Sequence, residues 1–197
     1  MGSSTAAGAG ASAGKTWTGL VQGAFADRAK LVNIAVGGST TYHGVSSSAA
    51  PVRGRPAVDP AANVDAALAH KPVLLIVSYP TNDTALGYST EETVSNLLSI
   101  RSQALAKAVP VVLLSTQPRA LNAAQLAQLQ SIDEQLAARV GPCFVQVRAL
   151  LAGPDGKLAP GYDAGDGVHP NEAGHQVIAT QVKALLDGGS CVRLGAN

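Results

Sequence analysis

The sequence predicts an α/β fold, in which a three-layer α/β/α sandwich is built around a parallel sheet. Two observations predict it. Short apolar runs rich in Val, Ile and Leu recur along the chain, and stretches with helical spacing of apolar residues separate them. Strands that alternate with helices form a parallel sheet covered on both faces. The 197 residues suit a single domain, 1–197, with a sizeable core.

Four apolar runs are expected to form the buried strands, because each is short and rich in β-branched residues. These runs are residues 31–36, 73–78, 111–115 and 144–147. The stretch 46–60 is rich in Ser, Ala, Pro and Gly and is expected to be a surface loop.

Helices are expected where a capping residue precedes apolar residues at helical spacing. The last helix is expected to end at Gly188 and to carry His175 on its surface. The predicted helix starts are Thr16, Asp59 with Pro60, Ser89 with Glu92, Asn122 with Gln125, and Asn171.

Composition excludes several classes of protein. The net charge of +1 gives no basis for binding nucleic acid or an anionic membrane surface. The longest apolar run, Val73 to Val77, is too short to span a bilayer, and no signal-peptide pattern precedes Gly2. Cys143 and Cys191 lack metal-ligand spacing, and the sequence leaves open whether they pair, as they would in an oxidising compartment.

Sites in parallel sheets lie beyond the carboxyl ends of the strands. GGSTTYHG follows the run 31–36, and YPTND follows the run 73–78. A loop after the last run carries DGVHPNEAGH, residues 166–175. We therefore expect these three segments to meet at one edge of the sheet.

The opening MGSSTAAGAGASAGKTW has three interpretations: a phosphate-binding loop over residues 9–16, a turn at residues 2–5 that presents a nucleophilic serine, or a flexible leader. The phosphate loop needs a preceding strand and a carboxylate ending another strand to hold magnesium, and neither is present. It also leaves Asp166 and His169 without a role. A serine nucleophile needs a base, a group that orients the base, and donors for an oxyanion, and the chain offers all of them.

Four blocks of the sequence resemble the SGNH hydrolase superfamily, the GDSL-type esterases and lipases. GSST matches the family's Gly-Asp-Ser block, with Ser3 where Asp is usual, and its serine is Ser4. NIAVGGST places the family's oxyanion glycine on Gly38. PTND matches the Gly-x-Asn-Asp block, with Pro80 in place of glycine and Asn82 as the oxyanion asparagine. Asp166 and His169, followed by a proline, match the Asp-x-x-His block.

The resemblance implies a flavodoxin-like sheet and a Ser4–His169–Asp166 triad, with the oxyanion held by Ser4, Gly38 and Asn82. The family places a central strand before the nucleophile; here that strand is short or missing, and the tail from Cys191 to Leu194 is one candidate to replace it. No metal or organic cofactor is expected. The expected substrate pocket comprises Thr40, Tyr42, His43, Pro80 and Val168.

The expected function is hydrolysis of carboxylic esters with short acyl groups, such as acetyl, through an acyl-enzyme. The expected partner is a small-molecule, carbohydrate or lipid ester, without nucleic acid or stable membrane insertion, and the oligomeric state is left open. The alternatives are a carbohydrate- or lipid-binding domain without activity and, within the enzymes, a lysophospholipase or thioesterase. The cysteines and the family's habit favour a location outside the cytoplasm.

Overall fold

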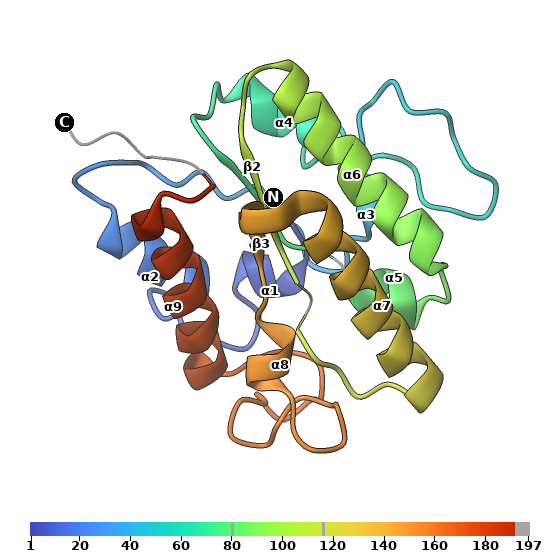
Figure 1. Ribbon diagram of the computed structural model, residues 1–197, viewed down its shortest axis with the longest axis vertical. Helices are drawn as coiled ribbons and strands as arrows, with labels where there is room; N and C mark the ends of the chain where they lie inside the picture. The colour runs from blue at the N-terminus through green and yellow to red at the C-terminus, as the bar shows by residue number, and fades with distance from the viewer. Residues whose placement is uncertain (80, 116, 192–197) are drawn as a thin grey trace.

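Parallel strands form the centre of the molecule, in the order β1 (Leu75–Val77), β2 (Val111–Leu114) and β3 (Phe144–Val145). The computed structural model describes residues 1–79, 81–115 and 117–191 of the chain (Figure 1). Each strand lies inside an apolar run that was predicted to be a strand. Apolar composition therefore located these three correctly, although each strand is shorter than its run.

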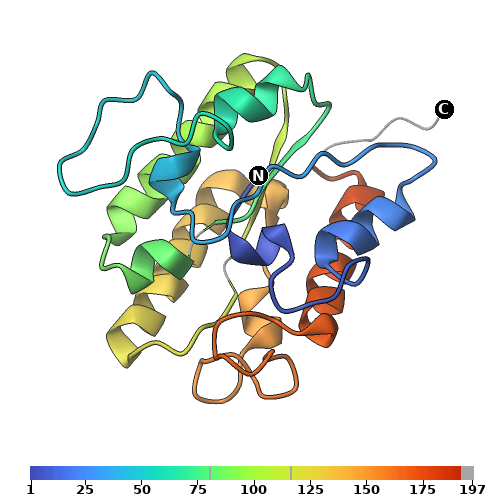
Figure 2. The ribbon, with the colours of Figure 1, turned by 180° about the vertical axis from the view of Figure 1, so that it is seen from behind.

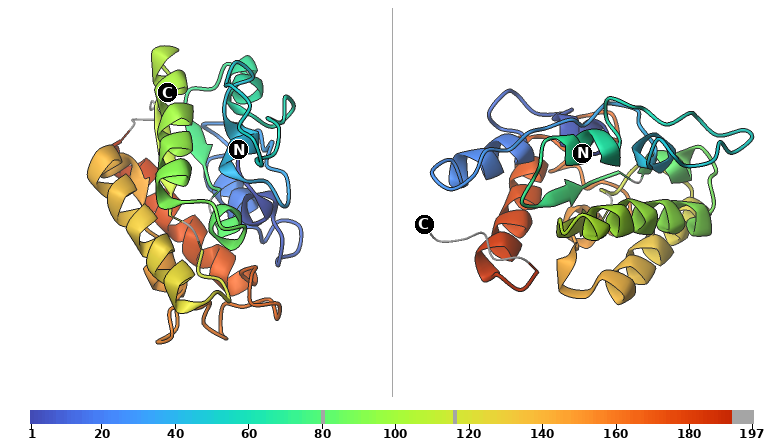
Figure 3. Two further views of the ribbon diagram at one scale, coloured as in Figure 1. Left: turned by 90° about the vertical axis from the view of Figure 1, so that its right-hand side faces the viewer. Right: turned by 90° about the horizontal axis from the view of Figure 1, so that it is seen from above.

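Helices cover both faces of the sheet, as the three-layer prediction requires. Alternate residues of β2 face opposite layers, because side chains alternate along a strand. Val111 and Leu113 belong to the core under α6 (Thr90–Ala106) and α7 (Ala123–Val140). Val112 and Leu114 belong to the core under α2 (Trp17–Ala24) and α9 (Glu172–Gly188). Figures 1 and 3 show the two helix layers on opposite sides of the strands.

Capping residues set most of the helix boundaries. The side chains of Thr16, Ser89, Asn122 and Asn171 each accept a hydrogen bond from the first turn of the helix that follows, as predicted. The remaining helices are short: α1 (Ser4–Ala7), α3 (Thr41–Gly44), α4 (Val64–Ala69), α5 (Thr81–Ala85), η1 (Gly141–Cys143) and α8 (Arg148–Leu151).

One predicted helix boundary is wrong. The helix expected at Asp59 and Pro60 begins instead at Val64, where the buried Asn63 caps it by accepting from the Ala66 amide. Asp59 caps only a local turn, through the amide of Ala61. The last helix ends at Gly188, as predicted, and Gly189, with φ of 62°, is its C-cap.

The run 31–36 was predicted to be a strand, and the structure contradicts this. The segment is assigned no strand, and Val32 and Val36 are 46% and 45% exposed. Its last residue alone reaches the sheet, where the Val36 amide donates to the Gly2 carbonyl at 3.1 Å. A strand requires a neighbouring backbone along its length, and sequence composition does not report that neighbour.

The segment Met1–Ser3, directly before Ser4, forms an isolated parallel bridge with the chain just after β1. It lies parallel to the end of β1, where Ser78 donates to the Met1 carbonyl at 3.1 Å and Ser3 donates to the Ser78 carbonyl at 3.0 Å. The backbone before Ser4 thus occupies the place beside β1 where the resemblance puts a strand. Most of the proposed tail, residues 192–194, lies outside the described residues. Cys191 itself forms a disulfide with Cys143, which answers the question of their pairing.

An apolar groove of about 500 Å³ lies where residues 31–34 run past residues 74–76. Its lining includes Met1 and Ala6 but none of Ser4, Asp166 and His169. The groove is therefore not the space in front of the predicted nucleophile. Across the described ranges, no helix combines the length and apolar character needed to cross a membrane.

Candidate active site

Ser4 is the first residue of α1, and this short helix, dark blue in Figure 2, lies near the middle of the molecule. Its side chain is half-buried, and its Oγ lies 2.9 Å from Nε2 of His169. As the first residue of a helix, Ser4 has a backbone N–H that no earlier turn can accept. Within the described part of the chain, nothing accepts from this N–H. A hydroxyl and a free backbone donor therefore occur on one residue.

His169 contacts both Ser4 and Asp166. Its Nδ1 lies 2.6 Å from Oδ2 of Asp166. A carboxylate only accepts hydrogen bonds, so Nδ1 carries a proton, and in the tautomer with its one proton on Nδ1 the Nε2 atom accepts from the Ser4 hydroxyl. The sequence-predicted serine, histidine and aspartate are thus joined in one hydrogen-bonded chain.

Backbone amides hold Asp166 in the ionised form. Its Oδ1 accepts from the amides of Val168 and His169, both at 2.8 Å. The His169 amide, together with the other hydrogen bonds to the carboxylate, lowers the pKa of Asp166 to about 2. Asp163 fixes the same loop by accepting from the amides of Gly165 and Gly167. The carboxylate that orients His169 is therefore itself fixed by its own loop.

The glycine-rich loop 37–39 lies beside Ser4. Gly38 has φ of +81°, a left-handed conformation that strains residues with a side chain. A Cβ at Gly37 would lie 3.9 Å from Cβ of Ser4, which places the loop next to the hydroxyl. Among the described residues nothing accepts from the Gly38 amide, so this N–H is free to donate to a bound group.

Asn82, on α5, lies between these two segments. Its Nδ2 donates to Ser3 Oγ at 2.8 Å and to the Ser39 carbonyl at 2.9 Å. Ser3 and Ser39 are the neighbours of Ser4 and Gly38. The three predicted oxyanion residues are therefore close together, although they come from three distant parts of the sequence.

The carboxylate of Asp83 ties the glycine loop to α5. It is fully buried and accepts from the backbone amide and the hydroxyl of Thr41. Burial raises the pKa of Asp83 to about 6, although the hydrogen bonds from Thr41 favour the ionised form. Asp83 is thus a structural link between the segments that carry Gly38 and Asn82.

Most residues predicted to line the substrate pocket are engaged inside the protein. Thr40 is buried, and both its amide and its hydroxyl contact Nδ1 of His43 at 3.0 Å. Val168 is half-buried beside His169, and its amide binds Asp166. Tyr42 is buried and donates to Glu92. Pro80 lies outside the described residues.

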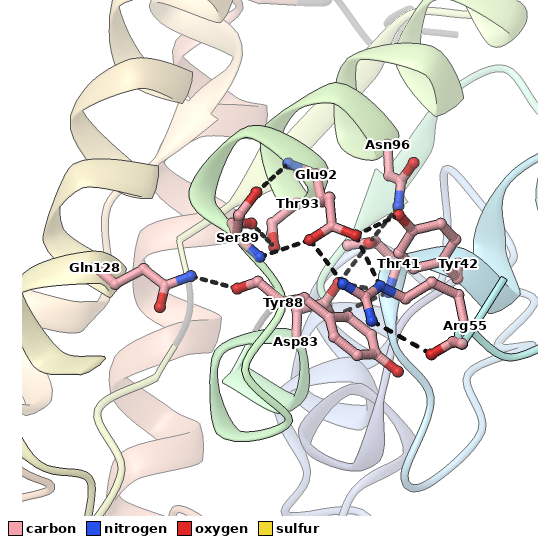
Figure 4. A network of polar contacts seen from close by, with 11 residues as sticks. Thr41, Tyr42, Arg55, Asp83, Tyr88, Ser89, Glu92, Thr93, Asn96 and Gln128 are labelled. Carbon is pink, nitrogen blue, oxygen red and sulfur yellow. Dashed lines mark hydrogen bonds and ion pairs between the residues drawn. The ribbon is translucent and has the colours of Figure 1, made fainter. Parts of the chain in front are cut away.

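Tyr42 belongs to a polar network behind the glycine loop, shown in Figure 4. Arg55 binds both carboxylate oxygens of Glu92, at 2.7 and 3.0 Å, and lies 4.1 Å from the centre of the Tyr88 ring. The hydrogen bonds from Arg55 lower the pKa of Glu92 to about 2. This bidentate contact anchors the long loop 46–62, which stands out from the helices in Figures 1 and 2.

The loop 9–16, considered above as a phosphate loop, packs against the histidine segment instead. A Cβ on Gly10 would lie 2.1 Å from the Pro170 carbonyl oxygen and 3.1 Å from Cβ of His169. Thr16 ends the loop by capping α2. The glycine at position 10 is therefore required by the close approach of the residues around His169.

His175 is buried, which corrects its predicted place on the surface of the last helix. Its exposed fraction is 0%, its Nδ1 accepts from the Trp17 amide at 3.1 Å, and its Nε2 donates to the Ala9 carbonyl at 2.9 Å. Burial lowers the pKa of His175, so the neutral ring is favoured. The residue joins α9 to α2 and to the loop after α1.

Replacing His175 with glutamine is expected to destabilise the fold more at neutral and alkaline pH than at acidic pH. An unmatched buried donor or acceptor costs about 1–3 kcal/mol. Because folding lowers the pKa of His175, its stabilising contribution is complete above the unfolded value near 6.5 and falls as the pH drops below it. The gap in melting temperature between the wild type and His175→Gln should therefore be wider at pH 8 than at pH 5. A gap independent of pH would contradict this.

Two contacts of Asn82 had no counterpart in the sequence interpretation. Arg119 donates from Nη1 to Asn82 Oδ1 at 3.0 Å, and Ser3 accepts from Nδ2 at 2.8 Å. Arg119 follows β2 at the same edge of the sheet, so the rule that sites follow strand ends points to it. Nothing in the sequence identifies Asn82 as its partner.

Together these groups have the chemistry of nucleophilic catalysis. A hydroxyl contacts an imidazole, a carboxylate orients that imidazole, and two free backbone donors lie near the hydroxyl. In this arrangement the imidazole can accept the serine proton without the help of a metal ion. It suits the attack of an oxygen nucleophile on a carbonyl carbon.

Comparisons with known proteins find related sequences and folds. The model of the GDSL-like Lipase/Acylhydrolase family matches residues 1–177, and no curated protein matches the chain. Three similar solved structures show the same fold. TesA is 23% identical with a TM-score of 0.71, and the match covers 95% of this chain and 96% of TesA. A lipolytic protein of the G-D-S-L family from Veillonella parvula is 18% identical with a TM-score of 0.73, and the match covers 94% of this chain and 95% of that chain. A carbohydrate acetylesterase family member from Sinorhizobium meliloti is 17% identical with a TM-score of 0.67, and the match covers 95% of each chain.

Proposed function

The chain belongs to the GDSL-like lipase/acylhydrolase family, and on this premise we propose that it hydrolyses small carboxylic esters with Ser4 as the nucleophile. The observation that carries the proposal is the hydrogen-bonded chain from Ser4 Oγ to His169 Nε2 and from His169 Nδ1 to Asp166, with distances of 2.9 and 2.6 Å.

In the first half-reaction, Ser4 Oγ attacks the ester carbonyl while its proton passes to His169 Nε2. The carbonyl π electrons move onto oxygen, and the amides of Ser4 and Gly38 with the Asn82 side chain stabilise the oxyanion. The tetrahedral centre then collapses, the bond to the alcohol oxygen breaks, and His169 returns the proton to the departing alkoxide. The acyl group is now esterified to Ser4.

The second half-reaction repeats these steps with water. His169 takes a proton from water as its oxygen attacks the acyl-enzyme, and the same donors stabilise the second oxyanion. Collapse breaks the bond to Ser4 Oγ, which recovers its proton from His169. A carboxylic acid leaves, and no electrons are gained or lost by the protein.

We propose short acyl groups, such as acetyl, as the substrates. The large apolar groove does not reach Ser4, and Trp17, Tyr42, Tyr79 and Tyr88 are all buried. A long acyl chain would need a continuous apolar surface beside the nucleophile. The structural neighbour named as a carbohydrate acetylesterase family member gives this acyl class further support.

The proposal is tested with para-nitrophenyl acetate, butyrate and octanoate, together with an alkyl fluorophosphonate that esterifies activated serines. We expect kcat/KM to fall with chain length, and the phosphonate to add its mass to the peptide that contains Ser4. Heat-denatured protein is the control for labelling. Preference for octanoate would overturn the acyl class. If the protein has native circular dichroism but shows no hydrolysis and no labelling, the result would favour the alternative of a binding domain.

A further inference from the structure

The segment after β2 connects the two halves of the candidate site. The Ala120 amide donates to the Gly167 carbonyl at 2.7 Å, and Gln117 Nε2 contacts the Val168 carbonyl at 3.4 Å. A Cβ on Gly167 would lie 2.9 Å from Cβ of Ala120, so the two backbones are in close contact. The segment is therefore fastened to the loop that carries Asp166 and His169.

From this position Arg119 reaches the other half of the site. Its Nη1 donates to Oδ1 of Asn82 at 3.0 Å, and its side chain is half-buried. A guanidinium group only donates hydrogen bonds, so Oδ1 of Asn82 must face it. The Asn82 amide then directs Nδ2 to the opposite side, toward Ser3 and Ser39. Arg119 and the Ser39 carbonyl thus fix the amide from its two ends.

The charge of Arg119 adds a second effect. Within the described ranges, no carboxylate forms an ion pair with Arg119. Asp83, the residue after Asn82, is bound to Thr41, and Asp166 is bound to His169. A positive charge at Oδ1 draws electron density from the amide and makes Nδ2 a stronger donor. It also favours negative charge that develops next to Nδ2.

We propose that Arg119 is a positioning residue of the oxyanion hole, which orients and polarises the Asn82 amide so that Nδ2 stabilises the oxyanion. For this, Nδ2 exchanges its hydrogen bond to Ser3 Oγ for one to the substrate and keeps its hydrogen bond to the Ser39 carbonyl. The proposal rests on the ester hydrolysis proposed above. Arg119 does not touch the reacting atoms in this scheme. It acts through Asn82, and it also connects the loop of His169 to the donor that serves the same reaction.

This role predicts a specific kinetic signature. Loss of one oxyanion donor costs about 10²- to 10³-fold in kcat. Weakening the hydrogen bond that Asn82 donates should lower kcat less than losing it. Arg119→Ala is therefore expected to lower kcat for para-nitrophenyl acetate by about tenfold to a hundredfold. KM should stay within about twofold, because the oxyanion forms only in the transition state. Arg119→Lys, which retains a charged donor, should recover part of the loss.

A double-mutant cycle with Asn82→Ala tests whether the effect passes through Asn82. If it does, Arg119→Ala should have little further effect on kcat in the Asn82→Ala background. Added guanidinium ion at non-denaturing concentration should raise kcat of Arg119→Ala but not of the double variant. Arg53→Ala, which removes an exposed arginine of the loop 46–62, is the control and should match the wild type.

The outcomes separate this inference from the function on which it rests. Wild-type hydrolysis with unchanged kcat in Arg119→Ala would overturn the inference alone. A raised KM with unchanged kcat would also overturn it, because Arg119 would then bind substrate directly. Additive losses in the double variant would show that Arg119 does not act through Asn82. Absence of wild-type hydrolysis would overturn the ester hydrolysis and the inference with it.

Discussion

Replacing Ser4 with alanine is expected to lower kcat for para-nitrophenyl acetate by about four to six orders of magnitude. The Ser4 hydroxyl lies 2.9 Å from His169 Nε2, and no other described hydroxyl contacts that atom. Without it, the imidazole has only water to activate, and the acyl-enzyme cannot form. Steady-state hydrolysis, with active-site titration by the fluorophosphonate, measures the effect.

The fold should survive this change, because the Ser4 side chain makes one hydrogen bond and is half-buried. Melting temperature and circular dichroism should match the wild type closely. Ser12→Ala is the matched control, since the Ser12 hydroxyl binds Glu172 rather than the site, and it should keep full activity. Activity of Ser4→Ala within about tenfold of the wild type would reject Ser4 as the nucleophile.

The parts of the fold that the sequence predicts well are those that local chemistry decides. Ser89 and Asn122 cap their helices through capping boxes, which depend on residues three positions apart. β2 is apolar on both faces because helices cover both faces, and composition alone reveals this. The run 31–36 has similar composition but lacks a neighbouring backbone along most of its length, which local sequence does not encode.

The same limit applies to the candidate site. Asp166 and His169 are three residues apart, so their contact is visible in the sequence. Gly38 and Asn82 were expected at the site because they follow predicted strands and match blocks of the family, although their separation from Ser4 gives no local signal. Arg119 is 37 residues from Asn82, and only the order of the parallel strands brings the two together. Polar contacts between loops could therefore be identified only from the structure.

The second large effect is expected for Asp166→Asn, which should lower kcat by about 10⁴-fold. Oδ1 of Asp166 accepts from two backbone amides, and Oδ2 accepts from His169 Nδ1. An asparagine must keep its oxygen toward the two amides, since its NH₂ group cannot accept from them. Its NH₂ group then faces Nδ1, which has to give up its proton and accept. The proton moves to Nε2, where it blocks transfer from Ser4.

Comparing Asp166→Asn with Asp166→Ala separates the choice of His169 tautomer from the loss of the carboxylate charge. Asp166→Ala removes the carboxylate without imposing a donor, so His169 remains able to carry its proton on Nδ1. We therefore expect Asp166→Ala to retain more activity than Asp166→Asn, although the alanine substitution removes more hydrogen bonds. Nitrogen chemical shifts of the His169 ring, measured by NMR, should report a proton on Nδ1 in the wild type and on Nε2 in Asp166→Asn. An asparagine variant with the proton still on Nδ1, or more active than the alanine variant, would show that Asp166 does not act by selecting the tautomer.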